Sequence, residues 1–307
     1  MSEVLGSFVV LIAVIALGYV LARVGLFDAT AAQVLARFTF FVATPALLLT
    51  TLADAEVEEL LSRTLLATSS SIVVVALVVV AVARFVWRRS VAETTITVLS
   101  ATYVNAGNLG LAVAAYALGD AALVAPVLLF QVLVMAPLAL AVLDATSVVG
   151  QHSLLRVATQ PIRTPVTISC LLGLLLSATG TALPSLVQQP VELVGRTAVP
   201  MALVAYGLSL HGAPRPGSGG TLRDLGLVVA LKVAVLPGLS YLVGRYALGL
   251  DGAELLAVTV TTALPTAQNV FVYAATFQRG TTIARDSVLV TTVLSVPALL
   301  LIVYVSA

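Results

Sequence analysis

The chain has 307 residues, of which 60% are hydrophobic and only 9% are charged, and its formal net charge is +1. Soluble domains carry about 25% charged residues, so this composition excludes an ordinary globular domain and indicates an integral membrane protein. The near-neutral charge argues against a nucleic-acid partner. The single cysteine, Cys170, excludes a disulfide framework and a cysteine-based metal site.

Ten apolar segments are long enough to cross a bilayer, which takes about 20 residues. We expect them at about 4–23, 31–52, 62–86, 94–118, 121–143, 163–180, 187–209, 222–246, 253–277 and 283–305. The chain is therefore predicted to be an all-α polytopic membrane protein with ten transmembrane helices.

The arginines between these segments predict their orientation. Most of them lie in the connections that follow odd-numbered segments, as Arg88 and Arg89 do, whereas the second connection carries Asp54 and three glutamates. Cytoplasmic loops are enriched in Lys and Arg. We therefore expect the odd connections in the cytoplasm and both termini on the outer side of the cell membrane.

The sequence also predicts an inverted repeat. Five segments lie in residues 1–143 and five in residues 163–307, with a cytoplasmic linker at 144–162 between them. Because five is odd, the second half must insert upside down relative to the first. Landmarks recur at nearly one offset: Gly18 with Gly173 and Pro45 with Pro200 at 155 residues, and Asn105 with Pro265 and Pro137 with Pro297 at 160 residues.

The fourth and ninth segments each contain a stretch that should interrupt a membrane helix. Asparagine favours caps and turns, and glycine weakens a helix by about 1 kcal/mol relative to alanine. Residues 105–108 are expected to separate half-helices at 94–104 and about 109–118, and the second break to separate 253–263 from 270–277. The residues that mark the two breaks are Asn105, Gly107, Asn108, Gly110, Pro265, Gln268 and Asn269.

These breaks indicate a binding site for an anion. Unwound backbone at this depth must find partners or line a water-filled cavity, and half-helix N-termini carry partial positive charge. Neither break contains Asp or Glu, which argues against a cation as the main substrate. Paired interrupted helices in an inverted repeat are typical of secondary transporters. Packing glycines and a simple proline kink remain an alternative for either break taken alone.

Four further residues are candidates for the site. Lys232 lies well inside the eighth segment and is a candidate for charge pairing or coupling, or else a lysine whose side chain reaches the interface. Gln131 is a candidate lining residue, although a single interhelical hydrogen bond would also explain it. Pro45 and Pro200 could shape the cavity wall or be simple kinks. No catalytic constellation, metal site or cofactor motif is found, so an enzyme is not expected.

The sequence resembles the auxin efflux carrier family of PIN-like transporters over most of its length. The resemblance rests on Ala43–Leu49, Asn105–Leu111, Ala198–Leu203, Leu231–Pro237, Ala263–Asn269 and Thr291–Pro297. It implies two inverted five-helix repeats in which the broken fourth and ninth helices cross and bind an organic anion, with roles for Asn105, Pro265 and Asn269. It also implies a dimerising scaffold of helices 1, 2, 6 and 7 and a transport domain of helices 3–5 and 8–10 that moves in an elevator mechanism.

The sequence departs from that family in places. Ala106 stands where plant members have proline, Ala112 stands where bacterial relatives often have it, and the long cytoplasmic loop of plant exporters is absent. A small carboxylate is therefore expected rather than auxin. A sodium-coupled symporter of the bile-acid type and, from another class, a non-transporting membrane sensor are the alternatives.

Overall fold

The computed structural model describes residues 2–53, 62–110, 113–114, 121–147, 165–218 and 220–306. Within these ranges the chain is nearly all helical, and the β-type contact that it contains is one isolated antiparallel bridge between Val104 and Thr266. In the described part of the chain, six helical segments are long and apolar enough to cross a membrane: Thr30–Ala53, Arg63–Val86, Pro126–Thr146, Ser185–Leu210, Leu222–Ala247 and Thr281–Tyr304. The protein is thus a helical, multi-pass membrane protein.

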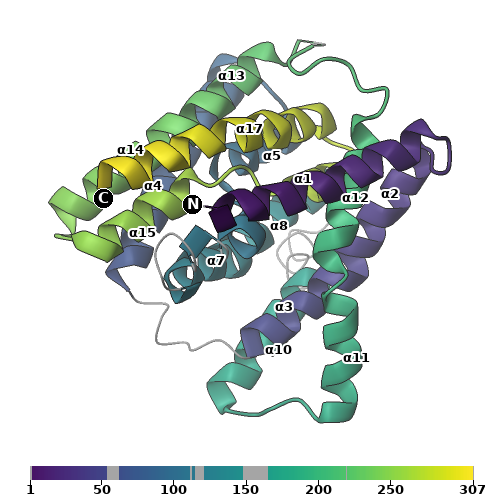
Figure 1. Cartoon of the computed structure of the whole chain (residues 1–307), viewed down its shortest axis with the longest axis horizontal. Helices are drawn as coiled ribbons and strands as arrows, with labels where there is room; N and C mark the ends of the chain where they lie inside the picture. Colours follow the sequence, from purple (N-terminus) through teal and green to yellow (C-terminus); the bar gives the residue numbers. More distant parts are fainter. Residues whose placement is uncertain are drawn as a thin grey trace.

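Figure 1 shows the arrangement of the helices. In the first half they are α1 (Ser2–Arg23), α2 (Ala29–Phe38), α3 (Thr44–Ala53), α4 (Arg63–Val80), α5 (Val91–Thr102), α7 (Ala125–Phe130) and α8 (Ala136–Ser147). In the second half they are α10 (Pro165–Thr179), α11 (Ser185–Gly195), α12 (Ala198–Leu210), α13 (Leu222–Ala230), α14 (Leu236–Leu242), α15 (Gly252–Ala263), α16 (Gln268–Phe277) and α17 (Thr281–Ser306).

Wide π-helical turns join several of these helices into longer rods. Three of the turns, Thr39–Ala43, Gln131–Met135 and Leu231–Val235, end two residues before a proline. In each case the residue before the proline donates its amide to the carbonyl five residues back. Proline has no amide hydrogen and crowds the preceding turn, so a locally wider turn lets the helix continue.

The seventh predicted segment consists of two helices rather than one bent helix. α11 ends at Gly195, Arg196 and Thr197 form a turn, and α12 begins at Ala198. The helix is thus interrupted at the turn, whereas Pro200 lies in the first turn of α12. Gly195 permits the close approach of α11 to α3, because a Cβ atom there would lie 2.8 Å from the amide nitrogen of Leu47.

The boundary between the predicted halves also differs. The fifth segment was expected to end at 143, but α8 continues to Ser147. The polar residues that begin the predicted linker, Asp144 onward, therefore form the last turn of a helix. The remainder of the linker, 148–162, lies outside the described residues.

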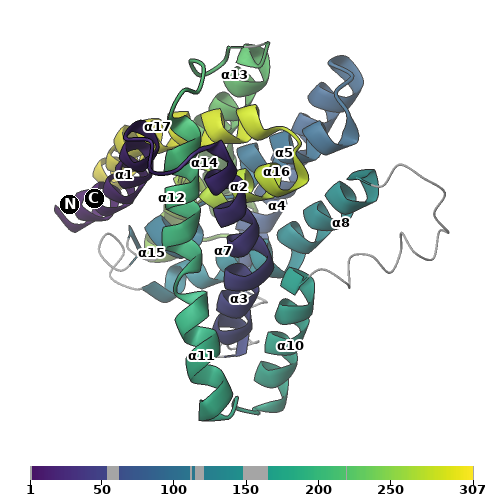
Figure 2. The same ribbon diagram turned by 90° about the vertical axis from the view of Figure 1, so that its right-hand side faces the viewer.

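The helices form two groups. One contains α1, α2, α3, α10, α11 and α12, and the other contains α4, α5, α7, α8 and α13–α17. Helices α3, α10 and α11 project beyond the rest of the molecule (Figures 1 and 2). Glycines allow close packing in the first group: a Cβ atom on Gly207 of α12 would lie 2.0 Å from the carbonyl oxygen of Ile15 in α1.

Candidate functional site

Two breaks in helical structure lie against each other inside the second group. α5 ends at Thr102, and helical backbone resumes at Ala106. α15 ends at Ala263, and α16 begins at Gln268. The first break therefore covers residues 103–105, and the prediction that it covers 105–108 is wrong by about two residues. The residues with extended backbone are the ones that pair with the second break. The sequence around Asn105 alone does not show which residues these are.

The two breaks are joined by backbone hydrogen bonds in an antiparallel arrangement. The amide of Asn105 donates to the carbonyl of Pro265 at 2.8 Å, and the amide of Ala267 donates to the carbonyl of Tyr103 at 3.1 Å. These bonds flank the bridge between Val104 and Thr266. Backbone that has left a helix inside the membrane needs such partners, because an unsatisfied buried polar group costs several kcal/mol there.

Side chains satisfy the remaining amides of the bridge. The amide of Val104 donates to Oε1 of Gln131 at 2.6 Å, and the amide of Thr266 donates to Oγ1 of Thr291 at 3.0 Å. The hydroxyl of Thr266 in turn donates to the carbonyl of Ser100 at 2.6 Å. Both breaks are therefore held by specific contacts from α5, α17 and the π-helical turn that carries Gln131.

A cavity of about 190 Å³ lies beside the paired breaks. Its wall is formed by α3, the two breaks, α7 with the following π-helical turn, and the first turns of α12 and α16. Among the described lining residues none has a charged side chain. The polar side chains in the wall are those of Thr44, Thr51, Tyr103, Asn105, Gln131, Gln268, Asn269 and Tyr273.

Three side-chain amides in this wall are available to a ligand. Asn105 and Gln268 are 4% and 3% exposed, and Asn269 is half-buried. All three residues line the cavity, and none of their side chains hydrogen-bonds to another described residue. In addition, α16 begins beside the cavity without a capping side chain, which leaves the first amides of this ten-residue helix without that partner.

Some of the predicted site residues line the cavity, and the others have different places in the structure. Asn105, Gly107, Gln131, Gln268 and Asn269 line the cavity together, although they come from three separate parts of the chain.

The other predicted residues take different places. Pro265 contributes its carbonyl to the pairing of the breaks. Gly110 permits packing, since a Cβ atom there would lie 2.8 Å from Cγ2 of Val124. Pro45 is buried next to the lining residue Thr44, and Pro200 is exposed; neither belongs to the wall. The side chain of Asn108 lies outside the described residues.

Several wall residues were not predicted. Thr44, Thr51, Tyr103 and Tyr273 also line the cavity. The rings of Tyr103 and Tyr273 meet edge to face with centroids 6.3 Å apart. Tyrosine and threonine are common in apolar segments, so their presence in the sequence does not by itself indicate a binding site. The two tyrosines nevertheless lie within a few residues of the breaks.

Lys232 lies away from the cavity wall. It is in the π-helical turn Leu231–Val235, which packs against α5, α15 and α17. Its side chain is fully buried, and Nζ has no hydrogen-bond partner among the described residues. A buried amine without partners is costly, so a lysine at this position is unusual on energetic grounds.

Comparison with known proteins gives a consistent result. A family model described as "Membrane transport protein" matches residues 3–147 and 151–303. The chain is also 29% identical over 306 residues to a protein of Rhizobium meliloti (strain 1021) named "Putative malonate transporter", and the match covers 96% of this chain and 93% of that protein.

Proposed function

The chain belongs to the membrane transport protein family, the family of the auxin efflux carriers that its motifs resemble, and on this premise we propose that it is a secondary transporter for a small organic carboxylate. Membership of this family makes it a membrane transporter and not an enzyme. The observation that carries the proposal is the uncharged, amide-lined cavity at the point where two helix breaks pair.

The chemistry of the cavity favours a small anion. Its volume of about 190 Å³ is below the range of about 300–1,000 Å³ that is usual for drug-sized ligands. Amide and hydroxyl groups can donate to a carboxylate, and the N-terminus of α16 adds partial positive charge. The R. meliloti relative is named for malonate, a small dicarboxylate.

We assign roles to the predicted residues on this basis. Asn105, Asn108, Gln268 and Asn269 hold the carboxylate, with Gln131 as a secondary contributor to the cavity wall. Gly107, Gly110 and Pro265 shape the backbone of the breaks. Lys232, which is buried outside the cavity wall, is the candidate for charge compensation or coupling.

An inverted repeat of two five-helix halves is part of the proposal, and packing at two glycines supports it. Gly18 in α1 approaches Val204 and Gly207 of α12, and Gly173 in α10 approaches Leu49 and Leu52 of α3. Gly173, Leu49 and Leu52 of the second contact lie 155 residues along the chain from Gly18, Val204 and Gly207 of the first, respectively. The same helix contact therefore occurs twice, as a repeated fold would require.

A connection between helices supports the repeat independently. Arg88 and Gly249 lie 161 residues apart, and both have positive φ, at 55° and 65°. The amide of the residue before each one donates to the carbonyl five residues earlier in the chain. The amide of the residue after each one donates to the carbonyl six residues earlier, as that of Arg89 does to Ala83 and that of Leu250 does to Gly244. α5 and α15, which follow these turns, both contain 12 residues.

We also propose alternating access between the two groups of helices. The group of α1, α2, α3, α10, α11 and α12 corresponds to predicted helices 1, 2, 6 and 7, and it would serve as a scaffold that forms a homodimer. The other group would carry the breaks and move past it, as in an elevator. Both termini would lie on the outer side of the plasma membrane.

Transport by purified protein in proteoliposomes tests the function. We expect uptake of radiolabelled malonate that depends on the protein and is reduced by excess unlabelled dicarboxylate, together with thermal stabilisation of the detergent-solubilised protein by malonate. Uptake that requires sodium would favour the sodium-coupled alternative. Stabilisation without flux would indicate a sensor, and no response to any carboxylate would contradict the proposal.

A further inference from the structure

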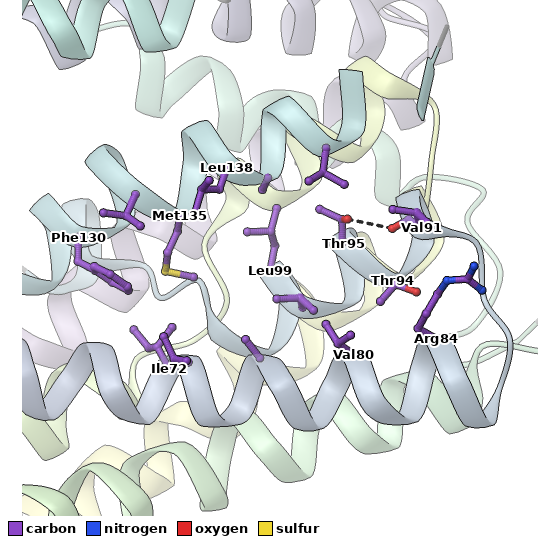
Figure 3. Close-up of a pocket in the computed structure, with 16 residues that line it drawn as sticks. Ile72, Val80, Arg84, Val91, Thr94, Thr95, Leu99, Phe130, Met135 and Leu138 are labelled. Carbon is purple, nitrogen blue, oxygen red and sulfur yellow. Dashed lines mark hydrogen bonds between the residues drawn. The ribbon is translucent and has the colours of Figure 1, made fainter. Parts of the chain in front are cut away.

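We propose that a groove between α4, α5 and α8 binds an anionic phospholipid, with one acyl chain in the groove and the phosphate at Arg84. The groove has a volume of about 410 Å³ and is lined by residues of α4, α5, α7 and α8 and of the turns that adjoin them (Figure 3). It shares no lining residue with the carboxylate cavity, from which the rod of α7 and α8 separates it. The inference does not depend on the proposed function.

The wall of the groove is suited to a hydrocarbon chain and not to a soluble anion. It is formed mainly by aliphatic side chains, with Phe130 and Met135 at one end. The hydroxyl of Thr95 is turned to its own helix, where it donates to the carbonyl of Val91 at 2.9 Å. Several wall residues, including Val73 and Leu138, are exposed, so the groove opens away from the protein core.

The length of the groove matches one leaflet of a bilayer. It runs along α4 and the following turn from Ile72 to Arg84, and along the facing rod from Phe130 to Val142. Each of these stretches contains 13 residues, and the twelve steps between its ends correspond to about 18 Å of helix. The hydrocarbon core is about 30 Å thick, so one leaflet is about 15 Å. An acyl chain that enters at the Arg84 end therefore reaches the depth of Ile72 and Phe130.

An arginine, Arg84, lies at one end of this groove. Arg84 is in the last turn of the segment that ends at Val86, and its side chain lines the groove at the end opposite Phe130 (Figure 3). Its guanidinium forms no ion pair with a described residue; its one hydrogen bond there is a long one of 3.4 Å to the carbonyl of Arg89. The neighbouring guanidinium of Arg89 is already bound to Asp224 at 2.6 Å. Among the described residues that line the groove, Arg84 is the charged one, and it is able to bind a phosphate.

A second polar group at the same end also lacks a partner. Thr94 lines the groove beside Arg84 and is only 5% exposed, and its hydroxyl has no hydrogen-bond partner among the described residues. A buried hydroxyl without a partner is unfavourable. A phosphate or ester oxygen of a lipid bound at Arg84 would accept a hydrogen bond from the Thr94 hydroxyl. A purely aliphatic ligand could not, because it has no acceptor.

Native mass spectrometry of the full-length protein in detergent tests this proposal. The protein is titrated with phosphatidylglycerol, with phosphatidylcholine of the same acyl chains, and with glycerol 3-phosphate. We expect phosphatidylglycerol to bind about fivefold more tightly than phosphatidylcholine, which is the contribution of one arginine near an anionic surface. Glycerol 3-phosphate, which has the phosphate but no acyl chain, should give no adduct.

Two variants and one control locate the lipid. Arg84→Gln should lower phosphatidylglycerol binding to the level of phosphatidylcholine. Ala76→Phe, which fills the groove, should weaken both lipids. Arg63→Gln removes an exposed arginine from the opposite end of the same helix and should change neither.

Equal binding of the two lipids by the unmodified protein, or unchanged selectivity in Arg84→Gln, would overturn the proposal. The proposal would also be overturned if a second copy of the chain occupied the groove, which would be seen as a dimer that dissociates in Ala76→Phe. Arg84 is an exposed side chain, so the Arg84→Gln result remains decisive if Ala76→Phe fails to fold.

Discussion

The amide of Asn105 donates a hydrogen bond of 2.8 Å to the carbonyl of Pro265, which lies 160 residues further along the chain. Proline has no amide hydrogen, so Pro265 cannot return this bond. The carbonyl of Asn105 accepts from the amide of Gly110 at 2.9 Å instead and so starts the next helical turn. The two breaks are therefore paired but unequal, and the one that contains Asn105 places a side-chain amide in the cavity.

Replacement of the cavity amides should remove transport without removing the fold. We expect Asn105→Ala or Asn269→Ala to lower malonate uptake more than tenfold, because a hydrogen bond to a charged group contributes about 1.5–3 kcal/mol. Uptake in proteoliposomes measures the effect, with size-exclusion chromatography to check that the variants purify normally. Gln189→Ala, which removes an exposed amide from α11, is the control. Wild-type flux in either variant would refute the assigned role.

Loss of the side chains that hold the bridge should destabilise the protein. Gln131→Leu leaves the amide of Val104 without its acceptor, and Thr291→Val does the same to the amide of Thr266. An unsatisfied buried donor costs about 1–3 kcal/mol, so each variant should unfold at a lower temperature. Thermal unfolding in detergent measures this, and Thr95→Val, whose hydroxyl bonds only within α5, should shift the midpoint less.

Lys232 can be tested by a substitution that keeps its volume. Lys232→Met retains a long flexible side chain and removes a buried amine that has no partner among the described residues. We expect equal or higher thermal stability, because the cost of burying an unpaired polar group is removed, together with a strong loss of malonate uptake. Transport at the wild-type rate would show that the lysine has no part in charge compensation or coupling.

Close packing of α1 on α12 depends on glycine. A Cβ atom on Gly207 would lie 2.0 Å from the carbonyl of Ile15, so Gly207→Leu must push the two helices apart. We expect a loss of at least 1–3 kcal/mol, as for overpacked cores, seen as a lower unfolding temperature. Gly226→Ala is the matched control, because nothing lies within 4 Å of its Cβ position in α13. That variant should be neutral or slightly more stable.

The unusual residues of the two breaks could be recognised in the sequence, but the register could not. Asparagine, glycine and proline inside long apolar segments identify a helix interruption because of their local preferences. Which residues become extended depends on the partner strand: Tyr103 and Val104 leave the helix because they pair with Ala267 and Thr266. Local preference alone put the break two residues too late.

Composition and the spacing of apolar residues determined by themselves that this is a multi-pass helical membrane protein, because the bilayer sets both the length and the polarity of a spanning helix. The motifs along the chain also indicated the family. Only the tertiary structure decided which side chains share a cavity, since Asn105, Gln131 and Gln268 come together through packing between distant helices. It also gave Gln131 its second function as the acceptor for Val104, a contact between residues 27 positions apart that no local pattern encodes.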